Sequence, residues 1–508
     1  MNGKLPGAGF VAFAFLLSAA QLQGADQPQF GQAWSRNMVS PEPGLPAQFD
    51  ITNEKNLRWR AELGTETHST PVIAGGRVYI GTNNGRPRDP KHEGDRGVLM
   101  CLEEAGGRLL WQWVVPKRTE DIYLDWPNSG IASPATVEGD RVYIVNNRGE
   151  VACLDALGMA NGNDGPFREE GRHMTPASTN ILTPGPLDAD VLWLFDLTEQ
   201  AGIWSHDAAH SSILIAGEHL YLNTGTGVDN THRKIRTPQA PSLVVLDKKT
   251  GRLLARDPEF LAANIFHSTW AAPSLGMVDG RPNLFFAAGN GILYAFDLLA
   301  HKPGPAVPPS AASLIKRWEF DFDPEAPKTN VHKYVGNRRE SPSDFYGMPV
   351  FHQNRIYLTG GGDIWWGKNQ AWLKCIRAET GDDLGSRLIW SYPLQKHVLS
   401  TPAVTEGLVY VADCGGLLHC VDAATGQPVW THEILGEVWA SPLVADGKVF
   451  IGTRRGQFYV FAAGREKKLL HTTEPGGPIS ATATAANQVL YITTMRHLYA
   501  IAQPEAAR

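Results

Sequence analysis

The chain has 508 residues, of which 43% are hydrophobic and 19% are charged, and it contains 52 Gly and 35 Pro. This composition is typical of a globular protein rich in turns. The formal net charge of −6 comes without a basic stripe, so nucleic acid is not expected as a partner.

The first residues, "MNGKLPGAGFVAFAFLLSAAQLQGADQ", place one lysine before an apolar run from Ala8 to Ala20, and small residues follow. This pattern predicts a signal peptide over residues 1–25, so we expect an exported protein, periplasmic or secreted. No cysteine lies near the expected cleavage site, so lipid attachment is not predicted. No later run of 18 apolar residues occurs, and no membrane span is expected. Residues 26–50 are read as an N-terminal extension.

From residue 51 to residue 508 the chain repeats one pattern of four short alternating strands separated by Gly-containing turns. The first strand of each unit has a recurring sequence: "STPVIA" from Ser69, "ASPATV" from Ala132, "HSSILI" from His210, "AAPSLG" from Ala271, "GMPVFH" from Gly347, "STPAVT" from Ser400, "ASPLVA" from Ala440 and "SATATA" from Ser480. Such units predict an all-β propeller with eight four-stranded antiparallel blades. A seven-bladed ring with one irregular unit is the alternative.

The eighth unit lacks its last strand, and "NLRWRAEL", with Trp59, stands before the first unit. We therefore expect this N-terminal strand to complete the last blade and close the ring, which leaves no free sheet edge.

Four of the five cysteines, Cys101, Cys153, Cys375 and Cys420, occupy one register of the third strand, where other units have Val or Ala. A position that accepts Cys, Val or Ala is a small buried site, so metal or redox roles are not expected. Cys414 and Cys420 are offset along the hairpin by about 10 Å, beyond the ~7 Å reach of a disulfide.

The segments "VDAATGQPVW", "LDKKTGRLL" and "IRAETG" resemble the tryptophan-docking repeat of pyrroloquinoline quinone (PQQ) propellers. That superfamily includes quinoprotein alcohol dehydrogenases and the propeller lipoprotein of the outer-membrane assembly machine. The chain looks closest to PQQ-binding-like β-propeller repeat proteins, and the resemblance implies PQQ and Ca²⁺ as possible cofactors. It departs from the dehydrogenases in having no adjacent cysteine pair and no C-x-x-C-H motif, and from the lipoprotein in lacking its lipid-attachment cysteine.

Residues just before the first strands are expected to line the mouth of the central channel, on the face where the long loops gather. When the eight units are aligned, one position before the first strand is rich in aromatic side chains. The position two residues earlier is rich in acidic side chains. Cofactor-binding candidates are His68, Trp270, Tyr346, Trp439 and the nearby Arg339. Glu66, Asp344 and Glu437 are candidate Ca²⁺ ligands, and Asp344, Asp207 and His267 are candidate catalytic groups.

Plainer interpretations stay open at these positions. Acids at a wet channel mouth can be merely solvated, and the aromatic rings can simply fill the centre of the ring. The sequence therefore favours an exported, monomeric binding scaffold for a protein, glycan or small-molecule ligand. A PQQ- and Ca²⁺-dependent dehydrogenase of alcohols or sugars is the alternative, and a lyase or hydrolase acting on carbohydrate is a third possibility.

Overall fold

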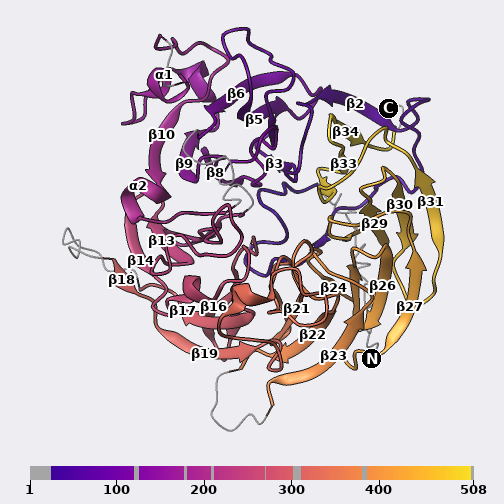
Figure 1. The fold of residues 1–508 in the computed structure, drawn as a ribbon. Coiled ribbons are helices and arrows are strands. Elements are labelled where there is room, and N and C mark those ends of the chain that lie inside the picture. Colours follow the sequence, from indigo (N-terminus) through magenta and orange to yellow (C-terminus); the bar gives the residue numbers. More distant parts are fainter. Residues whose placement is uncertain are drawn as a thin grey trace, which may run out of the picture.

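A computed structural model describes residues 24–118, 125–176, 180–206, 211–268, 270–300, 311–379 and 386–504. In these parts of the chain, eight antiparallel sheets stand around a central axis, as Figure 1 shows. The first strand of each sheet lies nearest the axis, and the last lies on the outer rim. The predicted eight-bladed propeller is confirmed, and the seven-bladed alternative is wrong.

The blades follow one another in chain order. Blades one to four contain β3 (Val72–Ala74), β4 (Arg77–Asn83), β5 (Arg96–Glu103) and β6 (Leu109–Pro116); β7 (Thr136–Glu138), β8 (Arg141–Val145), β9 (Glu150–Asp155) and β10 (Val191–Asp196); β11 (Leu214–Ala216), β12 (His219–Asn223), β13 (Leu243–Asp247) and β14 (Leu253–Arg256); and β15 (Ser274–Val278), β16 (Arg281–Ala287), β17 (Ile292–Asp297) and β19 (Lys316–Asp321).

Blades five to eight contain β20 (Val350–His352), β21 (Arg355–Gly361), β22 (Ala371–Arg377) and β23 (Leu388–Leu394); β24 (Ala403–Thr405), β25 (Leu408–Ala412), β26 (Leu417–Asp422) and β27 (Pro428–Glu433); β28 (Leu443–Ala445), β29 (Lys448–Gly452), β30 (Phe458–Ala462) and β31 (Leu469–Thr473); and β32 (Thr484–Ala486), β33 (Val489–Thr493), β34 (His497–Ile501) and β2 (Leu57–Glu62). The short strands β1 (Val39–Ser40) and β18 (Ala312–Ser313) add to blades seven and three, and the short helices are α1 (Glu170–His173), α2 (Leu197–Ala201) and the 3₁₀ turns Gly158–Asn161, Leu261–Asn264 and Val331–Tyr334.

The ring closes as the sequence predicts. The N-terminal strand β2 pairs antiparallel with β34, and Trp59 lies opposite Ala500. Blade eight is therefore built from both ends of the propeller, so separating it from blade one would require breaking a sheet. Within the described residues, no helix is long and apolar enough to cross a membrane.

Tryptophans on the outer strands of several blades dock against the next blade. The Trp390 indole N–H on blade five donates to the Ala423 carbonyl on blade six at 3.1 Å. In the same turn, Asp422 accepts the amides of Ala424 and Thr425. Gly426 then takes φ 73°, and a Cβ there would lie 2.6 Å from the Trp390 ring. The "ATG" motif is thus a turn whose glycine leaves room for the tryptophan of the preceding blade.

The cysteine register is also a packing feature. Cys420 lies between Tyr410 and Trp430 on the neighbouring strands, whose rings are 6.0 Å apart. Cys101 has the same position between Tyr79 and Trp111. All five cysteines are free, as predicted, and burial raises the pKa of the Cys420 thiol to about 12. A larger side chain here would push two aromatic rings apart.

A segment from Ala25 to Ser40, here called the inner strap, runs along the inner strands of the propeller (Figure 1). Its hydrogen bonds and bridges reach every blade: Gln27 with Ile73, Pro28 with Val137, Trp34 with Ile215 and Leu275, Ser35 with Phe351, Asn37 with Val404, Met38 with Val444, and Ser40 with Ala485. The first strand of a blade otherwise has an unpaired edge. The strap provides hydrogen-bond partners for part of that edge in all eight blades. The predicted signal peptide, residues 1–25, lies almost wholly outside the described residues.

We predict that Asn37→Ala destabilises the propeller. The Asn37 amide donates to the Val404 carbonyl and accepts the Val404 amide, both at 2.8 Å, and all of these atoms are buried. Losing both bonds should lower the free energy of unfolding by about 2–4 kcal/mol, since each buried group left unpaired costs about 1–3 kcal/mol. Urea denaturation measures this. Asn53→Ala, which changes an exposed asparagine, is the matched control and should stay within about 0.5 kcal/mol of the parent.

Candidate functional site

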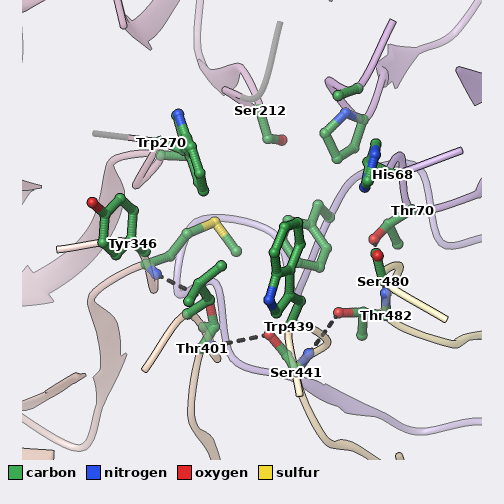
Figure 2. A pocket seen from close by; sticks show the side chains of 16 residues that line it. His68, Thr70, Ser212, Trp270, Tyr346, Thr401, Trp439, Ser441, Ser480 and Thr482 are labelled. Atoms are coloured by element: carbon green, nitrogen blue, oxygen red, sulfur yellow. Dashed lines mark hydrogen bonds between the residues drawn. The ribbon is translucent and has the colours of Figure 1, made fainter. Parts of the chain in front are cut away.

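A cavity of about 120 Å³ lies on the propeller axis. The four aromatic residues predicted for the mouth all line it: His68, Trp270, Tyr346 and Trp439 (Figure 2). Phe30 of the inner strap also lines it, so the strap forms part of the cavity wall. The sequence reasoning thus places these four side chains at one site, although it does not foresee the strap.

Hydroxyl groups form a second part of the lining. Four backbone N–H groups each donate to a side-chain hydroxyl of the next blade, at 2.9–3.2 Å. These bonds run from Met348 to Thr401, from Thr401 to Ser441, from Ser441 to Thr482, and from Thr482 to Thr70. Figure 2 shows the first three of these bonds. Because a hydroxyl has one donor besides its acceptor lone pairs, each O–H can still donate to a bound molecule.

The aromatic rings form a connected group. Trp270 and Tyr346 have centroids 4.9 Å apart, and His68 stacks on Trp439 at 6.0 Å. Trp365, which is 36% exposed, contacts both pairs, at 5.6 Å from Trp270 and 6.2 Å from Trp439. Trp365 was not among the predicted site residues. Its signal in the sequence is the paired tryptophan of "GGDIWWG" in a long loop between second and third strands.

Arg338 holds the Trp365 loop in place. Its guanidinium donates to the carbonyls of Ile364, Trp365 and Gly367 at 2.6–3.2 Å. The next residue, Arg339, is exposed and does not line the cavity. The sequence predicts Arg339 as a cofactor-binding residue, whereas the contacts to the site loop are made by its neighbour Arg338.

Asp363 is a buried acceptor behind the aromatic group. Its carboxylate accepts the Tyr346 hydroxyl, the His267 Nδ1–H at 2.9 Å and the Trp365 amide at 2.9 Å. Burial favours the neutral acid, but the His267 ring and these donors outweigh it and hold the pKa of Asp363 below its usual range. Asp363 is therefore an anion that joins the cavity wall to His267.

Asp344 is buried like Asp363, but it differs in its hydrogen-bond partners and in the direction of its pKa shift. It is 1% exposed, and neither carboxyl oxygen has a hydrogen-bond partner among the described residues. Burial first, and the charge of Asp363 second, raise the pKa of Asp344 well above its usual range. Its backbone pairs with Gly361 in an isolated bridge, which keeps this side chain inside the protein. Burial therefore favours the protonated form of Asp344.

The other predicted acids have a cation beside them already. Glu66 bonds to His68 at 2.8 Å, and Arg454 is close enough to Glu66 and to Glu437 to interact with both charges. The Arg454 guanidinium also lies 4.1 Å from the Trp439 ring centroid. Arg454 therefore contributes positive charge near both carboxylates, and Lys117 adds to it near Glu66. Asp207 lies outside the described residues.

The fit of PQQ and Ca²⁺ to this mouth is poor. Pockets for ligands of that size usually enclose ~300–1,000 Å³, several times the volume found here. Ca²⁺ takes six to eight oxygen ligands. Among the described residues, the groups of close ligand atoms include none of Glu66, Asp344 and Glu437. We therefore derive no chemistry through either cofactor.

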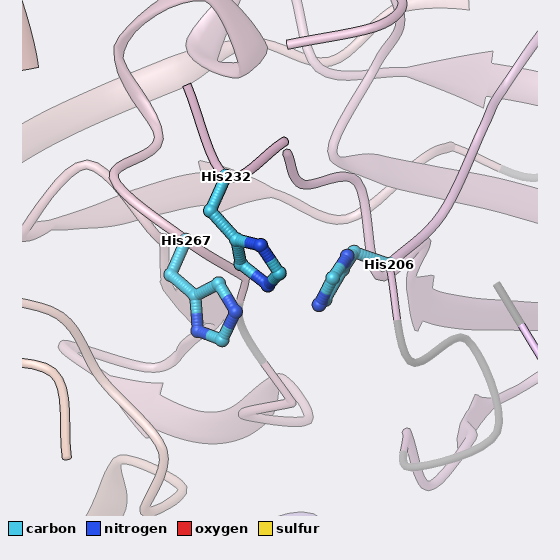
Figure 3. Close-up of side chains that lie close together, drawn as sticks. All are labelled: His206, His232 and His267. Atoms are coloured by element: carbon cyan, nitrogen blue, oxygen red, sulfur yellow. The ribbon is translucent and has the colours of Figure 1, made fainter. Parts of the chain in front are cut away.

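The third candidate catalytic residue, His267, lies beside the cavity wall rather than in the cavity. It gathers with His206 and His232, so that their ring nitrogens lie within 4.8 Å of one another (Figure 3). Of these three histidines the sequence predicts only His267, and His232 belongs to the loop between β12 and β13.

Comparison with known proteins agrees with this fold. The family described as outer membrane protein assembly factor BamB matches residues 369–501. A quinohemoprotein alcohol dehydrogenase of Comamonas testosteroni is 30% identical over 131 residues, which is 23% of this chain and 18% of that protein. The assembly factor BamB of Legionella pneumophila (strain Paris) is 30% identical over 115 residues, 23% of this chain and 27% of that protein.

The solved structure of BamB from Moraxella catarrhalis has a TM-score of 0.50 and 12% identity, and the match covers 88% of this chain and 98% of that chain. This likeness concerns the fold alone. The matched segments span less than a third of the length of these curated relatives. Together the matches confirm that the repeats are of the PQQ-like propeller type.

We predict that Asp344→Asn stabilises the protein as the pH rises. In the unfolded chain this acid titrates near pH ~4. Its pKa is raised in the folded state, which therefore holds the extra proton and loses stability as pH rises from the unfolded pKa through the folded pKa. The variant escapes this loss, so its melting temperature should match the parent near pH 3 and exceed it increasingly above pH 5. Asp279→Asn, at an exposed turn, should show no such trend.

Proposed function

We propose that this chain, whose repeats belong to the PQQ-like β-propeller family, is an exported binding protein that takes one compact sugar ring at its channel mouth. The observation that carries the proposal is the small axial cavity lined by both aromatic rings and side-chain hydroxyls. Export is supported by the apolar pattern of residues 1–25.

The cavity lining suits both the apolar C–H groups and the polar hydroxyls of a sugar. The C–H faces of a pyranose stack on aromatic rings, and Trp270, Tyr346 and Trp439 supply such rings. The hydroxyls of a sugar accept and donate hydrogen bonds, and the Thr and Ser residues of the lining offer O–H donors. The Trp439 indole N–H is buried without an acceptor among the described residues, and a ligand oxygen would satisfy it.

Size favours this ligand over a quinone. The cavity volume of about 120 Å³ is small, which favours a compact ligand over a larger one. The dehydrogenase alternative is supported by the names of two relatives, but the matched segments cover 18% and 16% of those proteins. A protein-binding scaffold is supported by the assembly-factor relatives, whose match to this chain covers 27% of one of them. Neither alternative accounts for the hydroxyl lining.

We predict that Trp439→Ala and Trp270→Ala weaken sugar binding by about tenfold each, since an aromatic contact contributes about 0.5–1.5 kcal/mol beyond its buried area. The measurement is a titration of the purified protein with a panel of mono- and disaccharides. Tryptophan fluorescence and the melting temperature report binding. Trp126→Ala, an exposed tryptophan outside the cavity lining, is the control and should bind as the parent does.

The same titration with PQQ and Ca²⁺ separates the alternatives. We expect no saturable change in quinone absorbance and no dye reduction with alcohols or sugars. Tight quinone binding that fails in Trp270→Ala would replace the proposal with the dehydrogenase. No response to any sugar, with the fold intact, would contradict the sugar site and leave the protein-binding alternative.

A further inference from the structure

We propose that His206, His232 and His267 form a binding site for a transition-metal ion of the Zn²⁺ class. Their ligand nitrogens lie within 4.8 Å of one another, and Figure 3 shows the three imidazole rings facing a common point. The rings are also in mutual contact, with centroids 4.8–5.3 Å apart. The site lies on the loops behind the aromatic cavity and is separate from the residues proposed to bind sugar.

The backbone brings the three histidines together through one residue. The Val228 amide donates to the His267 carbonyl at 2.9 Å, and the Val228 carbonyl accepts the His206 Nδ1–H at 3.0 Å. The loop that begins at Val228 is closed by a bridge from Val228 to Ile235 and carries His232 at its turn. Blades three and four thus meet at this point.

Two of the rings are oriented as metal ligands usually are. A ligating histidine commonly donates its other ring N–H to a carbonyl or a carboxylate, which fixes the tautomer and the ring direction. His206 donates Nδ1–H to the Val228 carbonyl, and His267 donates Nδ1–H to Asp363. Each therefore has Nε2 as its ligand atom. The Asp363 carboxylate lies behind the His267 ring and fixes its direction.

The ligand set selects the class of ion. Three neutral imidazoles, with no carboxylate in the group, suit Zn²⁺, Cu²⁺ or Ni²⁺ and do not suit Ca²⁺ or Mg²⁺, which need oxygen ligands. Among the described residues the group offers three protein ligands, which would leave a coordination position for water or for a ligand oxygen, as in catalytic rather than structural zinc sites. Around a tetrahedral Zn²⁺ the nitrogens would be ~3.3 Å apart. The half-buried His232 is the ring best placed to close that gap.

Two other groups of possible ligands are weaker candidates. In the group of Asp89, His92 and Asp188, the Lys91 ammonium already pairs with Asp188 at 2.5 Å and with Asp89 at 3.4 Å. The remaining group consists of aspartates alone. In neither group is a ligand ring oriented from behind by a buried carboxylate, as His267 is by Asp363.

The test is metal binding by the purified protein after treatment with a chelator. Isothermal titration with ZnCl₂ should find one equivalent per chain, and elemental analysis after dialysis should retain it. Titration with CoCl₂ should give the visible absorption of a cobalt ion bound by nitrogen ligands. Because Trp365 and Trp366 contact His267 and His232, Cu²⁺ should also quench tryptophan fluorescence at the same stoichiometry.

The variants are chosen to keep the fold. His232→Ala changes a half-buried loop residue and should weaken Zn²⁺ binding by at least ~100-fold, and Asp363→Asn should weaken it by ~10–100-fold through the orientation of His267. His432→Ala, a half-buried histidine on the outer strand β27, is the control and should bind as the parent does. Unchanged Zn²⁺ binding in folded His232→Ala, or no stoichiometric binding by the parent protein, would overturn the proposal.

Discussion

Closure of the ring by the N-terminal chain is the constraint on which the rest of the structure depends. The chain is used twice: β2 completes blade eight, and the inner strap then bonds to the first strands of all blades. A propeller needs only the first of these to remove its open seam. The second reduces the space on the axis, because Phe30 of the strap lines the cavity. A segment that precedes the repeats thus forms part of the wall of the axial cavity.

A second consequence concerns the long loops on the mouth face. The loop of residues 361–371 carries Trp365 to the aromatic rings and Asp363 to His267, while Arg338 holds its carbonyls. One buried carboxylate therefore serves two neighbouring sites. Burial is the main cause of the raised pKa of Asp344, and the negative charge of Asp363 adds to it. The acid expected from the sequence to be catalytic thus favours its protonated form near an acid that the sequence did not single out.

The repeat pattern predicts what is repeated, and it predicts little else. Eight blades, closure through Trp59 and the small residue between two rings at Cys420 all recur with the blade period, and the structure confirms them. The four aromatic side chains at the mouth follow from the same register. Trp365, Asp363 and His232 lie in loops of unequal length, where register has no meaning. The inner strap has no period at all, and its pairing depends on strand edges that exist only once the ring has formed.

Charge then distinguishes the two sites. At the mouth, Arg454 stands near Glu66 and Glu437 and lies over Trp439, so the local carboxylates are already balanced and a hard divalent ion would compete with a fixed guanidinium. Beside the mouth, the imidazoles of His206, His232 and His267 gather together, and the buried Asp363 carboxylate accepts the His267 Nδ1–H. A divalent cation is therefore disfavoured at the channel mouth, where the family resemblance would place Ca²⁺. The metal site that we propose lies instead on the neighbouring loops that carry His206, His232 and His267. The mouth itself is left suited to a neutral ligand.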